Sequence, residues 1–257
     1  MHYINLLGKV LIRFLRATGR LGLFTLETVY NCVTPPFYFK QFGKLLVEIG
    51  FYSLPVVALT TFFSGLVIAL QTYTGFAQFS AEGTIAFVVL VSVTRELAPV
   101  MAGLMVAGRI GASMAAELGT MRVTEQIDAL STLSTNPFKY LIVPRILAAV
   151  VMLPVLVFIG DIIGISGGYM IGVNKLDFNA ATYLASTWEN LKAMDIISGL
   201  VKAAVFGFII SLQGCYHGYY SKGGAEGVGQ ATTNAVVSAS ILILIFNYLL
   251  TEAFFTL

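Results

Sequence analysis

The stretch TRELAPVMAGLMVAGRIGASMAAELGTMRVTEQIDAL, residues 94–130, decides the fold of this chain. It joins an apolar helix with adjacent charges, a ribbon of small residues and a short polar segment. The helix begins near Thr84, and residues 84–119 contain one proline, Pro99. At about 1.5 Å per residue it would be about 54 Å long, whereas the hydrocarbon core of a bilayer is roughly 30 Å thick. The stretch therefore predicts a helix that crosses a membrane and projects beyond it.

Small residues recur at every fourth position of this helix. The row contains Gly103, Ala107, Gly111, Ala115 and Gly119, and a later apolar segment has a similar row of Gly160, Gly164, Gly168 and Gly172. Such small-xxx-small patterns let membrane helices approach closely. We interpret the rows as helix-packing surfaces, and direct contact with a substrate is the alternative.

A polar turn follows the long helix. Its charged residues are Glu117, Arg122, Glu125 and Asp128. Charges at this density exclude the segment from the bilayer core. Thr124 can cap a new short helix over residues 123–131, with Glu125 in the favourable first turn. Ile127 and Leu130 would share one face, and Glu125 and Asp128 another. A short amphipathic helix between two spans is either a surface anchor or a docking element.

The composition is that of a polytopic membrane protein. The 257 residues are 57% hydrophobic and 11% charged, with a mean hydropathy of +0.85. Soluble domains contain about 25% charged residues. Apolar segments predict about five transmembrane helices, over residues 52–71, 84–119, 140–173, 196–216 and 231–255. We therefore expect an all-α integral membrane fold, with residues 1–257 forming a single membrane-spanning domain.

Residues 1–50 precede these spans and differ from them. Over residues 4–30, cations recur at steps of four, three and four, and apolar residues fill much of the remaining surface. This pattern is typical of an amphipathic helix that lies in the headgroup layer of an anionic leaflet. Pro35 and Pro36 should end the helix, and we expect residues 37–50 to lead along the interface into the first span.

The distribution of basic residues predicts the orientation. Those before the first span are Lys9, Arg13, Arg16, Arg20, Lys40 and Lys44. By the positive-inside rule, the N-terminus should be cytoplasmic. With five spans, the polar turn would also be cytoplasmic and the C-terminus would face outside.

The sequence carries no recognisable catalytic or nucleotide-binding motif. GxxxxGK[ST] and HExxH do not occur, and His2 and His217 lie far apart. We therefore predict no enzymatic activity, no metal site and no cofactor in this chain. If ATP drives the protein, another chain should bind ATP and Mg²⁺.

The informative polar residues inside the predicted spans are Arg95, Glu96, Lys202, Asn247 and Glu252. An isolated charge there costs roughly 2.5–3.5 kcal/mol on insertion scales, so these groups should pair or face a wet cavity. Glu96 and Lys202 are the natural pair, serving either as a structural ion pair or as part of a polar patch that lines a lipid-headgroup path. Asp161 is expected near the outer end of its span, either as a partner for an N–H group or as an interfacial group rather than as a site.

Four motifs resemble one known family. ELGTMRVTEQIDAL, RELAPV, AGRIGASMAAE and NPFKYLIVPR are similar to the pattern of the MlaE/YrbE permeases, and the resemblance extends from about Phe39 to the end of the chain. These are membrane subunits of ABC transporters that move phospholipid with MCE-domain partners. The resemblance implies that residues 123–131 form the coupling helix that docks in a cytoplasmic ATPase. The coupling residues would be Glu117, Arg122, Thr124, Glu125, Gln126, Ile127, Asp128 and Leu130.

The resemblance also implies a cellular setting. A bacterial inner-membrane permease would form a central dimer with a second copy, deliver or receive phospholipid through an MCE-domain protein, and help maintain outer-membrane lipid asymmetry. In many systems a small regulator binds the ATPase, and no nucleic acid is involved. The resemblance supports the polar patch, although this chain has Asn247 where some relatives carry an acid; Glu252 either substitutes from one turn on or reaches the interface. An ion-coupled secondary transporter and an intramembrane scaffold are the alternatives.

Overall fold

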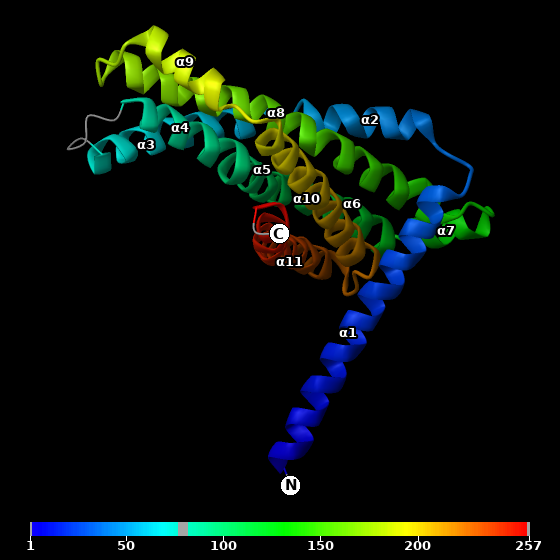
Figure 1. The fold of residues 1–257 in the computed structure, drawn as a ribbon. Coiled ribbons are helices and arrows are strands. Elements are labelled where there is room, and N and C mark those ends of the chain that lie inside the picture. The colour runs from blue at the N-terminus through cyan, green and yellow to red at the C-terminus, as the bar shows by residue number, and fades with distance from the viewer. Residues whose placement is uncertain (1, 77–81, 256–257) are drawn as a thin grey trace.

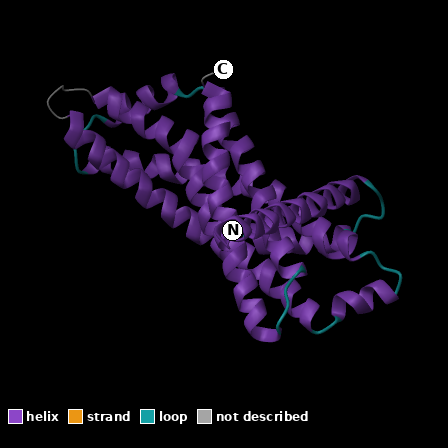
Figure 2. Ribbon diagram, turned by 90° about the horizontal axis from the view of Figure 1, so that it is seen from below, coloured by secondary structure: helices purple, strands orange, loops and turns teal. Residues whose placement is uncertain are grey.

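The computed structural model describes residues 2–76 and 82–255, with the side chains of residues 2–11, 13, 14, 76, 82 and 83 excepted. Helices joined by short loops form this part of the chain, which contains no strand (Figure 2). Five helical segments are long and apolar enough to cross a membrane: Phe39–Gly75, Thr84–Val123, Phe138–Asn174, Ala193–Tyr219 and Gly224–Phe255. The predicted all-α integral membrane fold is confirmed.

The helices are, in chain order, α1 (His2–Val33), α2 (Phe39–Gly50), α3 (Leu54–Phe76), α4 (Glu82–Ser92), η2 (Val93–Leu97), α5 (Ala98–Val106), η3 (Ala107–Gly111), α6 (Ala112–Val123), α7 (Gln126–Thr132), η4 (Phe138–Ile142), α8 (Val143–Asn174), α9 (Ala180–Asn190), α10 (Ala193–Tyr219) and α11 (Gly224–Phe255). The η segments are π-helical. In Figure 1, α7 and α9 lie at opposite ends of the bundle, which we call the α7 end and the α9 end. Helix α8 contacts α2, α3, α5, α9 and α10, and forms the centre of the fold.

Helix α1 touches the bundle only near its C-terminal end and otherwise stands away from it (Figure 1). Phe24 is 1% exposed and forms the anchor. Its ring packs on four others at the α7 end: Phe138, Tyr216, Tyr219 and Tyr220. Arg16 and Arg20 are exposed, as expected for a basic stripe, whereas the side chains of Lys9 and Arg13 lie outside the described part. The helix ends at Val33, just before the two prolines.

The first span differs from the sequence prediction. It begins at Phe39 rather than near residue 52, because α2 packs along α8 and continues into α3 after a short turn. A Cβ atom at Gly50 would overlap the Met152 side chain, so the two helices are in close contact there. Pro55 lies in the first turn of α3, where a missing N–H group costs no helical hydrogen bond. Residues 39–50 therefore pack on the bundle through α8.

The second span is one long helix with two π-helical segments, and it ends at Val123 instead of residue 119. Segment η2 contains Arg95 and Glu96, and η3 contains Arg109. Single π-helical turns inside α-helices are frequent at functional sites. Both segments therefore place charged residues where functional sites are common.

Glycine rows form the helix contacts. Added Cβ atoms at Gly103 and Gly160 would lie 3.2 Å from Phe206 and 3.1 Å from Thr61, and one at Gly164 would lie 2.9 Å from Val93. Gly111 and Gly168 face Ile210 and Val89, and Ala107 is fully buried. The closest approach joins α3 to α8, where a Cβ at Gly65 would overlap the Gly164 carbonyl. The spans therefore pack closely along these rows, backbone to backbone at Gly65 and Gly164 and backbone to side chain elsewhere.

At the α9 end, the short helix α9 covers the bundle through Tyr183, which is 3% exposed. The ring lies against Gly172 and its hydroxyl near Gly168. Burial raises the pKa of Tyr183 to about 12, so the phenol is neutral. The glycine row on α8 therefore accommodates an aromatic ring as well as a neighbouring helix.

Candidate functional site

Lys202 of α10 is the centre of an intramembrane polar cluster. Its side chain is fully buried, and its amine donates to Glu96 Oε1 at 2.7 Å, to Thr251 Oγ1 at 2.8 Å and to the Arg95 carbonyl at 2.8 Å. A lysine ammonium has three donors, and all three are used. The expected pairing of Glu96 and Lys202 is present.

Glu96 is held from two helices and remains partly open. Its Oε2 accepts from Asn247 Nδ2 at 2.8 Å, and the Thr251 hydroxyl lies 2.9 Å from its Oε1. Its side chain is 38% exposed. Asn247 therefore belongs to the cluster, whereas Glu252 is exposed and Thr251 contacts Glu96 instead. Neighbouring helical residues point about 100° apart, so Glu252 cannot share the Thr251 face.

Arg95 pairs with a residue that the sequence reasoning missed. Its Nη2 lies 2.8 Å from Asp195 Oδ1, its Nε donates to the same oxygen at 2.9 Å, and its guanidinium lies 4.1 Å from the Phe255 ring centre. Asp195 is 1% exposed and lies in the first turn of α10, where the helix dipole favours a carboxylate. The sequence feature that could have revealed Asp195 is its position seven residues before Lys202. This spacing puts the two side chains on one face of a helix, two turns apart.

The cluster presents one charge of each sign to its surroundings. Arg95 and Glu96 are 27% and 38% exposed, whereas their partners Asp195 and Lys202 are buried. Two cations and two carboxylates balance, so the cluster carries no net charge. The accessible guanidinium and carboxylate match a group that also carries both signs, such as a zwitterionic headgroup.

An apolar groove begins beside the cluster. It has a volume of about 490 Å³ and lies between α3 and α5. Its lining residues are Leu59, Thr60, Phe63, Ser64, Val67, Ile68, Leu97 and Met101. Leu97 directly follows Glu96 in the chain, so the groove and the polar cluster lie at the same level of the second span, on neighbouring faces of the helix. Together the groove and the cluster suit an amphipathic molecule.

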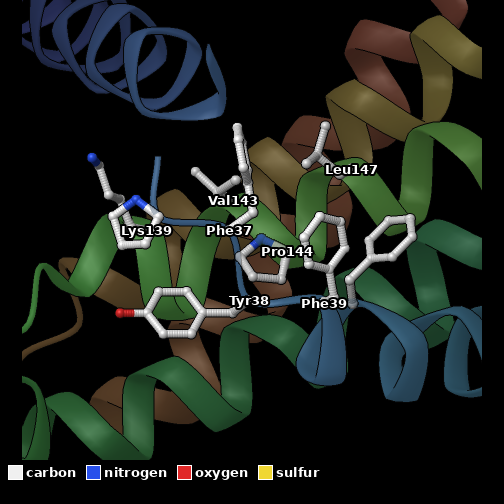
Figure 3. Close-up of a pocket in the computed structure, with 9 residues that line it drawn as sticks. Phe37, Tyr38, Phe39, Lys139, Val143, Pro144 and Leu147 are labelled. Carbon is white, nitrogen blue, oxygen red and sulfur yellow. The ribbon is translucent and has the colours of Figure 1, made fainter. Parts of the chain in front are cut away.

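A second cavity, of about 100 Å³, lies where the α1–α2 linker meets η4 and α8. Figure 3 shows Phe37 and Phe39 beside Pro144 and Leu147, with the Lys139 amine directed away from these rings. That amine donates to the Pro35 carbonyl at 2.6 Å. The cavity is therefore an apolar packing junction rather than a headgroup site.

The short helix after the second span has a different start from the predicted one. Thr124 does not cap it, because the Thr124 hydroxyl donates to the Thr120 carbonyl at 2.7 Å within the preceding helix. Glu125 occupies the N-cap position with a φ of 60°, and α7 runs from Gln126 to Thr132. The chain reverses through this left-handed residue, a turn that a capping pattern does not reveal.

The faces of α7 are as expected. Ile127 is buried and Leu130 is partly buried, whereas Thr124, Glu125, Gln126 and Asp128 are exposed. Asp128 accepts from Arg122 at 2.6 Å, and that guanidinium lies 5.9 Å from the Tyr219 ring centre. Helix α7 thus presents an open acidic face at its end of the bundle.

Glu117 belongs to the bundle rather than to α7. Its Oε2 lies 2.9 Å from Nη2 of Arg145, which also donates to the Leu141 carbonyl. Arg145 was missed, because the motif containing it was interpreted only as the start of a span. Arg145 is buried and Glu117 is exposed, so this ion pair ties α6 to α8 at the edge of the bundle.

Asp161 is not the interfacial group that the sequence suggested. It lies near the middle of α8, is 4% exposed, and has no hydrogen-bond partner on either carboxylate oxygen. The predicted span had placed it nearer the outer end. Among the described residues, no group of three or more His, Cys, Asp or Glu side chains could hold a metal ion.

Comparison with known proteins identifies the family. The profile of the family described as Permease MlaE matches residues 42–253. The chain belongs to the MlaE permease family. It is 62% identical over 255 residues to a probable ABC transporter permease protein of Rickettsia bellii, covering 99% of this chain and 98% of the relative. It is 33% identical over 256 residues to the intermembrane phospholipid transport system permease protein MlaE of Haemophilus influenzae, covering 99% and 98%. The resemblance seen in the sequence is therefore confirmed, and the chain is an ABC transporter permease of the MlaE family.

Proposed function

We propose that this MlaE-family permease moves phospholipid between the bacterial inner membrane and an MCE-type partner outside it, and so helps maintain outer-membrane lipid asymmetry. The observation that carries the proposal is the neutral cluster around Lys202, with an apolar groove at the same level of the second span. The cluster would hold the headgroup and the groove the acyl chains. The name of the Haemophilus relative, which specifies phospholipid transport, supports this substrate class.

The work of transport enters through α7. ATP and Mg²⁺ bind a separate cytoplasmic ATPase, which docks on the exposed acidic face containing Glu125 and Asp128. A small regulator binds that ATPase. This places the α7 end and the N-terminus in the cytoplasm, and the α9 end and the C-terminus in the periplasm. The charge at the start of the chain supports this orientation.

A second copy of the chain completes the path. The α11 span is the least buried of the five, with 17% of its most apolar window buried, compared with 28–50% in the other four. Helix α11 also supplies Asn247 and Thr251 to the cluster, so a symmetric partner against α11 would lie beside the site. The path would then be enclosed by both copies.

Reconstitution tests the proposal. The permease and its ATPase, placed in vesicles with a fluorescent phospholipid, should move the lipid in an ATP-dependent manner. The double variant Glu96→Leu/Lys202→Met should fold and lose most of this movement, while Lys175→Gln, which removes an exposed charge from the end of α8, should retain it. Lipid movement that is driven by an ion gradient without the ATPase would instead support a secondary transporter. A complex without any lipid movement would support a scaffold.

A further inference from the structure

Arg109 is an intramembrane cation without an acidic partner. Arg95, Arg122, Arg145 and Lys202 each pair with a carboxylate, whereas Lys139, at the start of its span, donates to the Pro35 carbonyl. The Arg109 guanidinium instead donates to Ser53 Oγ at 2.7 Å and lies 5.8 Å from the Tyr52 ring centre. Within the described residues, no carboxylate lies at ion-pair distance from it. A guanidinium has five N–H donors, and a single neutral hydroxyl leaves most of its hydrogen-bonding capacity and all of its charge uncompensated.

The position makes this arrangement unfavourable without a ligand. Arg109 lies 14 residues before the Val123 end of its span and 25 residues after the Thr84 end. These separations correspond to about 21 Å and about 37 Å of helix, so Arg109 lies in the half of the span nearer α7, within reach of the headgroups of that leaflet. Charged groups at such depth pair with one another or mark a substrate or ion pathway. The missing partner is therefore expected to be an anion from outside the chain.

The helix surface beside Arg109 is open. A Cβ atom placed on Gly108 would meet nothing within 4 Å, and Met105 is 37% exposed. Leu97, Met101, Met105 and Gly108 follow at steps of four, four and three, so they share one side of the second span. The first two line the apolar groove. The side that forms the groove therefore continues to Arg109.

The facing helix shows the same continuity. Exposed apolar side chains on α3 recur at steps of four, three and four from Tyr52 through Val56 and Leu59 to Phe63. Leu59 and Phe63 line the groove, and Tyr52 lies beside the guanidinium. One end of this apolar strip thus carries an unpaired cation. An anionic head with apolar chains matches both features.

We propose that Arg109 binds the phosphodiester group of a phospholipid in the leaflet nearer α7, with the acyl chains directed along α3 and α5 toward the groove. The planar guanidinium donates two parallel hydrogen bonds to phosphate oxygens. The tails of a lipid in that leaflet run toward the membrane centre, which is the direction of the groove. The Ser53 hydroxyl and the Tyr52 ring flank the phosphate.

This site is distinct from the cluster around Lys202. Arg109 follows Glu96 by 13 residues, about 20 Å along the helix, so the two sites lie at different depths. The inference shares the lipid class with the proposed function but concerns binding alone. Its test contains no ATPase, so a chain that binds lipid at Arg109 without transporting it would give a positive result here and a negative result in the transport assay.

The experiment counts bound lipids on the purified full-length protein. Detergent-solubilised protein is incubated with dioleoyl phosphatidylglycerol or with dioleoylglycerol, which lacks the phosphate, and retained molecules are counted by native mass spectrometry. Charged hydrogen bonds contribute enough that Arg109→Gln should lower phosphatidylglycerol occupancy about tenfold or more. Arg109→Lys should be intermediate, because it keeps the charge and loses the planar fork. Lys175→Gln is the matched charge-loss control and should behave like the unaltered protein.

A second variant leaves the arginine in place. Gly108→Leu places a bulky side chain on the open helix surface next to Arg109 in the chain, and the absence of neighbours within 4 Å permits it to fold. It should lower phosphatidylglycerol occupancy as Arg109→Gln does. Unchanged occupancy in either folded variant, or equal retention of dioleoylglycerol, would overturn the proposal. Displacement of the lipid by millimolar inorganic phosphate would assign the site to free phosphate and would also overturn it.

Discussion

Lys202 and Glu96 form an ion pair whose members differ sharply in exposure, because the lysine side chain is fully buried and the glutamate is 38% exposed. Because water does not reach the lysine ammonium, the glutamate carboxylate is the group that compensates its charge. The glutamate keeps one side open, where a ligand can contact it. The same bond thus stabilises three helices and leaves a polar surface at the groove.

Removing one member of this pair should cost more than removing both. Glu96→Leu leaves Lys202 buried without its carboxylate, which typically costs about 3–5 kcal/mol, whereas Glu96→Leu/Lys202→Met leaves no orphan charge and should recover most of that loss. Thermal unfolding of the detergent-purified protein measures the difference. A single variant as stable as the unaltered chain would show that the pair does not stabilise the fold.

Gly65 tests the backbone contact between α3 and α8. A methyl group there would overlap the Gly164 carbonyl, so Gly65→Ala should lower stability by about 1–3 kcal/mol. Gly75 lies on the same helix with nothing within 4 Å, and Gly75→Ala should leave the melting temperature equal or slightly higher. The two variants share one chemical change, so equal melting temperatures would contradict the close contact.

Glu125 tests docking on α7. The exposed carboxylate has no ion-pair partner among the described residues, so Glu125→Lys should reverse a free surface charge without disturbing the fold and should weaken ATPase association. Rim charges act mainly on association rate, so the effect should shrink at high salt. Glu189→Lys on α9, also exposed but at the opposite end, is the control. Co-purification of the ATPase at normal yield with Glu125→Lys would remove the docking assignment.

Cysteine labelling tests the orientation. In a Cys32→Ser background, Glu252→Cys and Glu189→Cys should react with an impermeant thiol reagent applied from the periplasmic side. Glu125→Cys should react only after the inner membrane is opened. Cys215 is fully buried and burial should keep it unreactive. The reverse labelling pattern would invert the topology and place α7 where no cytoplasmic ATPase could reach it.

Physical rules for apolar segments predicted the spans and the central ion pair. Glu96 and Lys202 are more than a hundred residues apart, yet the cost of isolated charges in lipid was sufficient to pair them. The same rule failed for Arg95 and Asp195, because a span boundary drawn at residue 196 assigned Asp195 to a loop. Placing α10 three residues earlier puts Asp195 inside the span.

Other differences arise from tertiary contacts that a local pattern does not carry. The sequence of residues 39–50 alone resembles that of an interfacial segment. In the structure these residues pack on α8, as the Gly50–Met152 contact shows. Thr124 has the side chain of a helix cap, but the left-handed backbone of Glu125 turns the chain first. Arg109 and Arg145 lie in motifs interpreted through their small and apolar residues. Their roles depend on partners from other helices.

Tyr219 touches both of the elements that leave the bundle at the α7 end. Its ring packs against Phe24 of α1 and lies beneath the Arg122 guanidinium, which in turn holds Asp128 of α7. Tyr219 would therefore couple α1, which we expect on the lipid surface, to α7, which we propose binds the ATPase. A displacement of α7 by the ATPase would change the angle of α1, and a change in the lipid surface beneath α1 would shift α7.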